Sequence, residues 1–148
     1  MKNIIVIESA DRELAAKTGR IISARKGIPF YLDEIERKTA LECNVEPSEL
    51  YLEQSRAVTD MFAIVEIMLM KKGPCVILGG AAAYILGSYE NVLTVCLASK
   101  KVTDVKYDRF VRKYTGCEIN RYKGYSLAAH ADEISAEEAA DFICDFAK

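Results

Sequence analysis

The stretch from residue 72 to residue 87 constrains the fold of this chain more than any other. Gly73-Pro74 ends a preceding helix, because proline cannot continue a helix and glycine suits the turn beyond it. Cys75–Leu78 is a short uninterrupted apolar run, typical of a strand buried on both faces in a parallel sheet. Gly79-Gly80 then allows a tight turn into helix-forming residues 81–86. We interpret the stretch as the central strand–turn–helix unit of an α/β domain, with Gly79-Gly80 at the edge where such sheets bind ligands.

The rest of the chain alternates between strand and helix patterns. Short apolar or β-rich runs predict further strands at Asn3–Ile7, Ile28–Tyr31, Asn91–Ala98 and Tyr125–Ala129. Capping residues and apolar spacing predict helices at Asp11–Lys26, Asp33–Glu42, Ser55–Lys72, from Thr103 or Asp104 to Gly116, and at Ser135–Ala147, and Pro47 opens one further segment. This alternation predicts a three-layer α/β/α fold with a parallel sheet of four to five strands.

The helix predicted at Ser55–Lys72 has an unusually wide apolar belt. Apolar residues cover most of its circumference, which is too wide for one face packed against a sheet. The pattern indicates either full burial in the core or a second packing partner. Burial is the simpler interpretation, and a homodimer through this helix is the alternative, since exposed Met-rich surface is often a contact surface.

Length and composition exclude several classes of protein. The chain has 148 residues, enough for one domain spanning 1–148 that buries about 70% of its unfolded surface. A net charge of −2, with Lys and Arg scattered, argues against nucleic-acid binding. No apolar run reaches the length of a membrane span, so we expect a cytoplasmic protein without membrane attachment. Five cysteines without a C-x-x-C pair favour reduced thiols over a disulfide or metal framework.

Several fragments resemble the cytidylate kinase-like family, whose members have the P-loop nucleoside monophosphate kinase fold. The fragments are Gly27–Tyr31, Gly73–Gly79 with Tyr84–Leu86, Tyr114–Gly116, Tyr125, Leu127 and Glu137–Asp141. Each motif is short, and their shared order and spacing over most of the chain carry the resemblance. It implies a P-loop NTPase-like fold and, for a complete member, phosphoryl transfer from ATP with Mg²⁺.

The chain departs from this family where phosphate would bind. The family's glycine-rich loop lets several backbone N–H groups point at phosphate oxygens, and a Cβ there would obstruct that curl. Its positions fall on Arg12–Ala16, where glycine is absent, and Glu8, Asp11 and Glu13 add charge that repels a triphosphate. Other family positions fall on Leu32, Gly80, Asp104, Tyr107 and Ser126, so that of these only Asp104 keeps the family's residue. The stretch between Ala98 and Asp104 is too short for the family's mobile lid.

Loss of the loop, the lid and the arginines together removes the charge stabilisation on which phosphoryl transfer depends. We therefore interpret the chain as a shortened, degenerate relative: a non-catalytic, pseudokinase-like protein without a cofactor. It would act on an unknown partner, by protein contact or by weak binding of a small molecule. One alternative is an active nucleotide or small-molecule kinase that uses ATP and Mg²⁺ at an atypical site. A second alternative is a structural homo-oligomer.

The candidate binding residues lie beyond a predicted strand end or at the start of a predicted helix. They are Arg12, Asp33, Gly79, Gly80, Lys100, Lys101 and Asp104. Most have an ordinary structural interpretation as well: Asp33 suits a helix N-terminus, Lys100-Lys101 suits an exposed loop, and Arg12 suits pairing with Glu8, Asp11 or Glu13. No catalytic residue is identified, because Ser9 has no evident base. The single histidine, His130, lacks neighbours at metal-ligand spacing, so no metal site is predicted.

Overall fold

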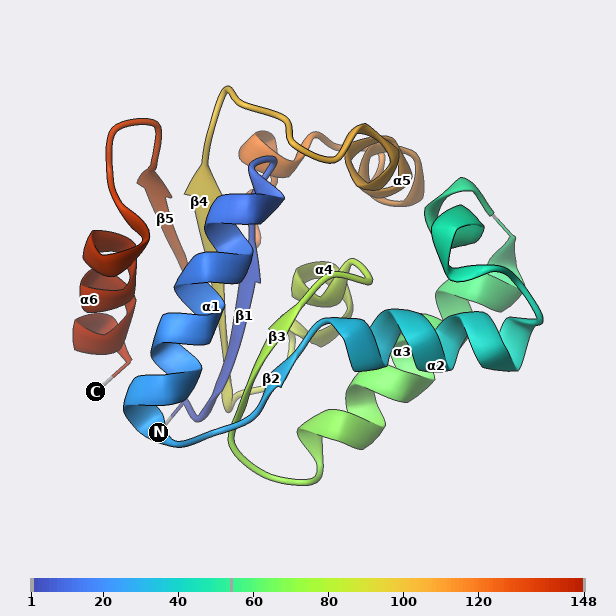
Figure 1. Ribbon diagram of the computed structural model, residues 1–148, viewed down its shortest axis with the longest axis horizontal. Coiled ribbons are helices and arrows are strands. Elements are labelled where there is room, and N and C mark those ends of the chain that lie inside the picture. The colour runs from blue at the N-terminus through green and yellow to red at the C-terminus, as the bar shows by residue number, and fades with distance from the viewer. Residues whose placement is uncertain (1, 54, 148) are drawn as a thin grey trace.

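A computed structural model describes residues 2–53 and 55–147, and Figure 1 shows its central parallel sheet. The five strands are arranged in the order β2-β3-β1-β4-β5. Their bounds are Ile4–Glu8 for β1, Phe30–Tyr31 for β2, Cys75–Leu78 for β3, Val92–Ala98 for β4 and Leu127–His130 for β5. β1 lies in the middle, with Ile4 paired to Cys75 on one side and to Val92 on the other. The predicted parallel α/β sheet is confirmed.

Helices cover both faces of the sheet, as Figure 1 shows. One face carries α1 (Arg12–Lys26) and α6 (Ala136–Phe146), which pack on Ile5 and Ile7. The other face carries α3 (Arg56–Met70) and α4 (Ala82–Leu86), which pack on Ile4 and Val6. Side chains of a strand alternate between the two faces, so β1 contributes to two separate halves of the core. The remaining elements are α2 (Asp33–Cys43), η1 (Pro47–Leu52), α5 (Val105–Thr115) and η2 (Ile119–Arg121).

Local sequence signals place the helix ends. The side chains of Asp11, Ser55 and Asp104 each accept a hydrogen bond from the backbone N–H three residues later, which caps α1, α3 and α5. Ser135 and Glu138 form the predicted capping box of α6. These caps satisfy backbone donors that a helix start otherwise leaves unpaired, so the predicted starts of these helices are confirmed.

Some boundaries differ from the sequence predictions. Ala81 was expected in a helix but has a left-handed φ of 54°, and α4 begins only at Ala82. The last strand is displaced toward His130, and the strand predicted at Ile28–Tyr31 is only two residues long because Pro29 precedes it. α3 ends at Met70, and its outer residues are exposed, so the prediction of full burial is wrong.

The remaining features bear on the class of protein. All five cysteines are free, and Cys75 and Cys96 are buried in strands as expected. Among residues 2–53 and 55–147, no helix has the length and apolar character needed to cross a membrane. Within the same described residues, no group of three or more His, Cys, Asp and Glu side chains is placed to hold a metal ion.

Candidate functional site at the carboxyl edge of the sheet

The turn between β1 and α1 occupies the position where a phosphate-binding loop would lie. It has only three residues, Ser9–Asp11, before α1 begins at Arg12. The hydroxyl of Ser9 donates to the Leu97 carbonyl across the sheet at 2.6 Å, which ties the turn to β4. Four backbone N–H groups of this region already donate to side-chain oxygens: Ser9 to Glu8, Asp11 to Ser9, Glu13 to Thr103 and Leu14 to Asp11. These donors are therefore not available to a ligand.

Arg12 lies across the edge next to this turn. Its guanidinium donates to Asp104 at 3.0 Å and contacts Glu36 at 3.4 Å, and only 12% of its side chain is exposed. The guanidinium carbon lies 3.9 Å from the centre of the Tyr107 ring, a close cation–π contact. Arg12 thus joins α1, α2 and α5. It pairs with neither Glu8, Asp11 nor Glu13, so that interpretation of its role is wrong.

The electrostatic surroundings keep Arg12 charged. Burial acts to lower the pKa of its guanidinium, but nearby Tyr51, Tyr107, Glu36 and Glu8 outweigh that effect and raise the pKa above the ordinary value. Its positive charge is shared by two carboxylates, and its Nε is buried without an acceptor among the described residues. The positive charge of Arg12 is therefore already neutralised by the protein.

The turn after β3 is held by two tyrosines. Gly79, Gly80 and Ala81 have φ values of 94°, 58° and 54°, a left-handed run that glycine adopts readily and alanine does not. The N–H of Gly80 donates to the Tyr51 hydroxyl at 3.0 Å, and the N–H of Ala81 donates to the Tyr107 hydroxyl at 3.3 Å. These bonds hold Ala81 in its strained conformation.

Two buried carboxyl groups lie beneath this turn. Tyr107 donates to the Glu8 carboxyl at 2.5 Å, yet burial dominates and raises the pKa of Glu8 to about 7. Glu66 of α3 is 0% exposed, and neither carboxyl oxygen has a hydrogen-bond partner among the described residues. Burial first, and then the nearby Glu8, raise the pKa of Glu66 well above its ordinary value. Glu66 therefore keeps its proton to a higher pH than an ordinary glutamate does.

The structure brings four of the seven candidate residues together. Arg12 and Asp104 form an ion pair, and a Cβ on Gly79 would lie 2.9 Å from the Arg12 guanidinium. Gly80 follows in the same turn, and a Cβ there would lie 2.3 Å from the Glu66 carboxyl. Asp33, Lys100 and Lys101 lie apart from this group: Asp33 is exposed in the first turn of α2, and the Lys100 N–H donates to Asp132. Whether any of the seven binds a ligand stays a prediction.

A small hollow remains beside α1 at this edge, with a volume of about 390 Å³. Its lining mixes three cations, two carboxylates and three other side chains: Arg12, Lys17, Arg20, Glu13, Asp104, Ala16, Leu32 and Thr103. Arg12 and Asp104 already pair with each other, which leaves Lys17 and Arg20 exposed at the rim. The hollow therefore has no strong surplus of either charge.

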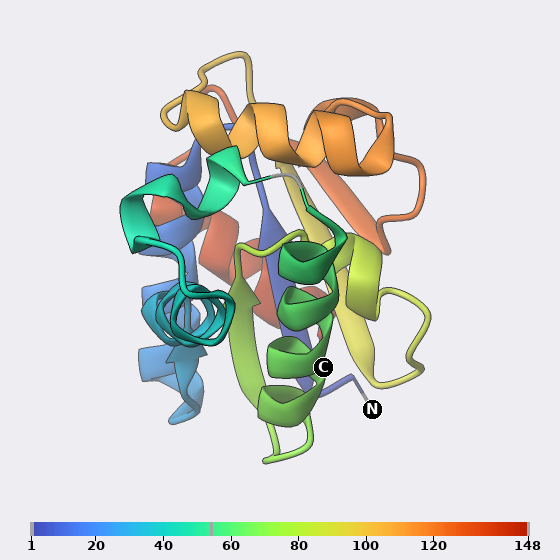
Figure 2. The same ribbon diagram turned by 90° about the vertical axis from the view of Figure 1, so that its right-hand side faces the viewer.

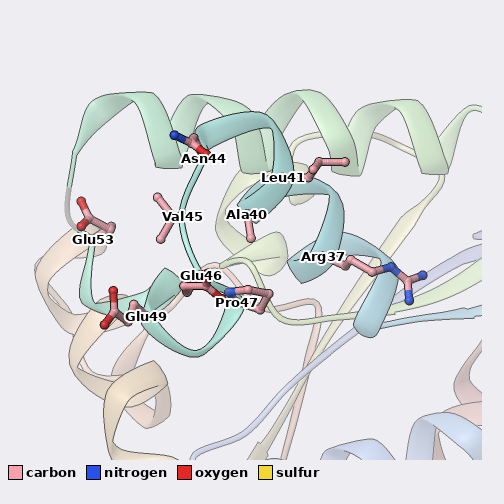
Figure 3. A pocket seen from close by; sticks show the side chains of 9 residues that line it. All are labelled: Arg37, Ala40, Leu41, Asn44, Val45, Glu46, Pro47, Glu49 and Glu53. Carbon is pink, nitrogen blue, oxygen red and sulfur yellow. The ribbon is translucent and has the colours of Figure 1, made fainter.

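A larger hollow lies away from the strand ends, between α2 and η1. Figure 3 shows the side chains that line this surface groove, whose volume is about 620 Å³. Its lining includes three glutamates and one arginine, Glu46, Glu49, Glu53 and Arg37. None of the candidate residues lines it. The larger volume of this groove thus does not make it the candidate site. The candidate residues that the sheet topology brings together lie at the carboxyl edge of the strands instead.

Sequence reasoning missed the tyrosines and the buried acid of this edge. Tyr51 and Tyr107 come from separate elements and meet at a ring-centre distance of 4.8 Å. No local motif marks that meeting. Glu66 did leave a signal, since it is the only charged residue between Asp60 and Lys71, and it lies one helical turn after the buried Phe62.

These features define the class of fold to which the chain conforms: a three-layer α/β fold of the P-loop kinase type, with a closed turn in place of an open phosphate loop. No protein-family model and no curated protein sequence matches the chain. Solved structures do resemble it. Shikimate kinase from Aquifex aeolicus superposes with a TM-score of 0.66 at 15% identity, covering 95% of this chain and 94% of that chain.

Two further structures agree. Shikimate kinase from Acinetobacter baumannii, in complex with shikimate, gives a TM-score of 0.67 at 12% identity, over 99% of this chain and 92% of that one. An uncharacterized protein from Eubacterium ventriosum gives 0.63 at 13% identity, over 97% of both chains. At such identities the likeness shows the fold alone, and it confirms the kinase-type fold expected from the sequence.

Proposed function

We propose that this chain is a non-catalytic, degenerate relative of the cytidylate kinase-like proteins that acts through contact with another protein. The observation that carries the proposal is the occupied turn between β1 and α1. The N–H groups of Ser9 and Asp11 in this turn donate to Glu8 and Ser9, and those of Glu13 and Leu14 in the first turn of α1 donate to Thr103 and Asp11. Phosphate binding at a helix N-terminus requires such donors to be free and directed at the ligand.

The energetic cost of opening this turn supports the proposal. A typical hydrogen bond contributes about 0.5–1.5 kcal/mol net, so releasing the four donors would cost roughly 2–6 kcal/mol. A triphosphate would also meet Asp11 in the turn and would have to displace Asp104 and Glu36 from Arg12. Each of these changes opposes nucleotide binding, and together they disfavour it strongly.

The alternative is an active kinase with an atypical site. It requires Arg12 to leave its two carboxylates and stabilise a transferring phosphoryl group instead. The acceptor would then be a nucleoside monophosphate, by the resemblance of the sequence, or shikimate, by the complex of the Acinetobacter baumannii structure. Among residues 2–53 and 55–147, no contact at the sheet edge favours an open site over the closed turn.

Nucleotide binding and ADP release separate the two functions. The melting temperature of the purified chain is measured with ATP or GTP and Mg²⁺. In a separate assay, release of ADP from ATP is followed with CMP or shikimate as acceptor. A ligand at 100 times its Kd would add about 2.7 kcal/mol of stability, which shifts the melting temperature by roughly 5–10 °C. We expect no shift with nucleotide and no ADP release.

A variant guards against a contaminating kinase. Arg12→Lys keeps the charge but loses the two-armed geometry, so a genuine activity of this chain would fall while a contaminant's activity would not change. ADP release that depends on acceptor and falls in Arg12→Lys would refute the non-catalytic function.

A further inference from the structure

The outer face of α3 is apolar from Met61 to Met70, beyond the exposed pair of Arg56 and Asp60 in its first turns. Between residues 61 and 70 the only polar residue is Glu66, and it points inward and is 0% exposed. Ile64 and Met68 are 50% and 55% exposed on the opposite side. Figure 2 shows α3 facing outward between α2 and α4. A surface helix normally carries polar residues on its outer face, so this one lacks the face expected of a monomer.

The outward residues also follow the spacing of a helix that packs on another helix. Ala57, Met61, Ile64, Met68 and Lys71 are separated by steps of four, three, four and three residues. Such steps form one seam along a helix, as in a coiled coil. The inward residues of α3, Val58, Phe62, Val65 and Leu69, are buried in the chain's own core. Met61 is half-buried and also packs on that core, whereas Ile64 and Met68 are exposed, so the middle of the seam is additional to the packing that the fold itself needs.

We propose that two copies of this chain associate through this seam, with their α3 helices antiparallel. A two-fold axis that crosses the outer face of α3 at the level of residue 66 would place Ile64 of each copy against Met68 of the other. The same axis would place Met61 against the aliphatic stem of Lys71 of the second copy, which gives four layers from Met61 to Lys71. Ala57 lies beyond these layers. An antiparallel pair of identical helices is self-complementary, which a symmetric dimer requires.

Charge at the two ends of the seam favours this partner and this orientation. Asp60 lies at one end, and Lys71 lies at the other; neither Lys71 nor Lys72 has an ion-pair partner among the described residues. The pair of Asp60 with Arg56 spans 3.6 Å between side chains that are 64% and 93% exposed, so it holds Asp60 weakly. In the antiparallel dimer each Asp60 lies beside the layer that contains Lys71 of the second copy. A parallel dimer would instead bring like charges together.

The inference names a partner for the interaction role proposed above, but it does not depend on the absence of catalysis. A dimer that released ADP would refute the proposed function and leave this inference intact. A monomer that released no ADP would overturn this inference and leave the proposed absence of catalysis intact.

Sedimentation equilibrium from micromolar to near-millimolar chain tests the dimer. We expect a monomer–dimer equilibrium that Ile64→Glu weakens about 100-fold or more, since the change occurs twice in a symmetric interface. Leu41→Glu is the matched control, because Leu41 is 76% exposed on α2 and lies outside the seam. It should leave the equilibrium unchanged, and circular dichroism should show both variants folded. A monomer at every concentration would overturn the proposal, even if α3 captured a different protein. So would a dimer insensitive to Ile64→Glu or equally sensitive to Leu41→Glu.

A charge exchange tests the orientation. Asp60→Lys should weaken the dimer several-fold, and adding Lys71→Asp to the same chain should restore it. Failure of the double variant to recover would overturn the antiparallel arrangement.

Discussion

The buried carboxyl of Glu66 predicts an unusual dependence of stability on pH. The unfolded chain releases this proton near the ordinary pKa of 4.5, whereas the folded chain keeps it because the pKa is raised well above that value. The folded state then binds more protons than the unfolded state, so the free energy of unfolding falls as pH rises. This stability is fully present below about pH 4.5 and is lost progressively above it.

The size of the effect follows from the number of protons. For each pH unit over which a carboxyl is protonated only in the folded chain, the free energy of unfolding falls by about 1.4 kcal/mol, which is at most about 2–3 kcal/mol between pH 5 and pH 7. Glu8, whose pKa is raised to about 7 mainly by burial, adds a similar loss over the same interval and levels off above pH 7. Both losses are large beside a typical stability of about 5–15 kcal/mol.

Urea denaturation at pH 5, 6 and 7 measures this loss directly. Glu66→Gln has nearly the same size but no proton to release, so its stability should fall less than that of the natural chain over this interval, by up to about 2–3 kcal/mol. Glu133→Gln, at an exposed position, is the control and should keep the natural dependence on pH. If Glu66→Gln kept it as well, Glu66 would be ionised or hydrated in the folded chain, and the reasoning would be refuted.

Two further predictions concern the closed edge. Gly80→Ala would place a Cβ 2.3 Å from the Glu66 carboxyl and 2.7 Å from the Phe62 ring, at a φ of 58°. It should lower the free energy of unfolding by about 3 kcal/mol or more, whereas Gly27→Ala, at a φ of 65° with open space, should cost only about 1 kcal/mol. Equal losses in thermal melts would show that the Gly80 turn is not tightly packed. Arg12→Ala leaves Asp104 and Glu36 unpaired and should lower the free energy of unfolding by roughly 2–4 kcal/mol, whereas Arg25→Ala, at the exposed pair with Asp141, should have little effect. If Arg12→Ala lowered the free energy of unfolding as little as Arg25→Ala, Arg12 would not stabilise the contact between α1, α2 and α5.

The sequence was most informative where structure is local. The caps at Asp11, Ser55, Asp104 and Ser135 each involve a side chain and a backbone N–H three residues apart, so the sequence shows both partners. The buried strands are also local features, because each is a continuous apolar run in the sequence. Those signals suffice for a parallel α/β sheet.

The site was only partly predictable because its contacts are distant in the chain. Arg12 reaches Glu36 across 24 residues and Asp104 across 92, and nothing near Arg12 indicates either partner. Ala81 has high helix propensity, but its conformation is set by the Tyr107 hydroxyl, 26 residues away. The sequence did place Gly79 and Gly80 at the carboxyl edge of the sheet. It could not separate Arg12 and Asp104, which meet at this edge, from Lys100 and Lys101, which follow a strand end but lie apart.

The central claim is that the turn after β1 is closed to phosphate. The measurement that tests it most directly is a nuclear magnetic resonance titration of the backbone N–H groups of this turn and of the first turn of α1. The resonances of Ser9, Asp11, Glu13 and Leu14 are followed while ATP and Mg²⁺ are added to millimolar concentration. We predict that these four resonances do not move, because their protons are already donated to side chains of the protein. Movement that saturates at all four would show that the turn opens and holds phosphate, and it would contradict the claim.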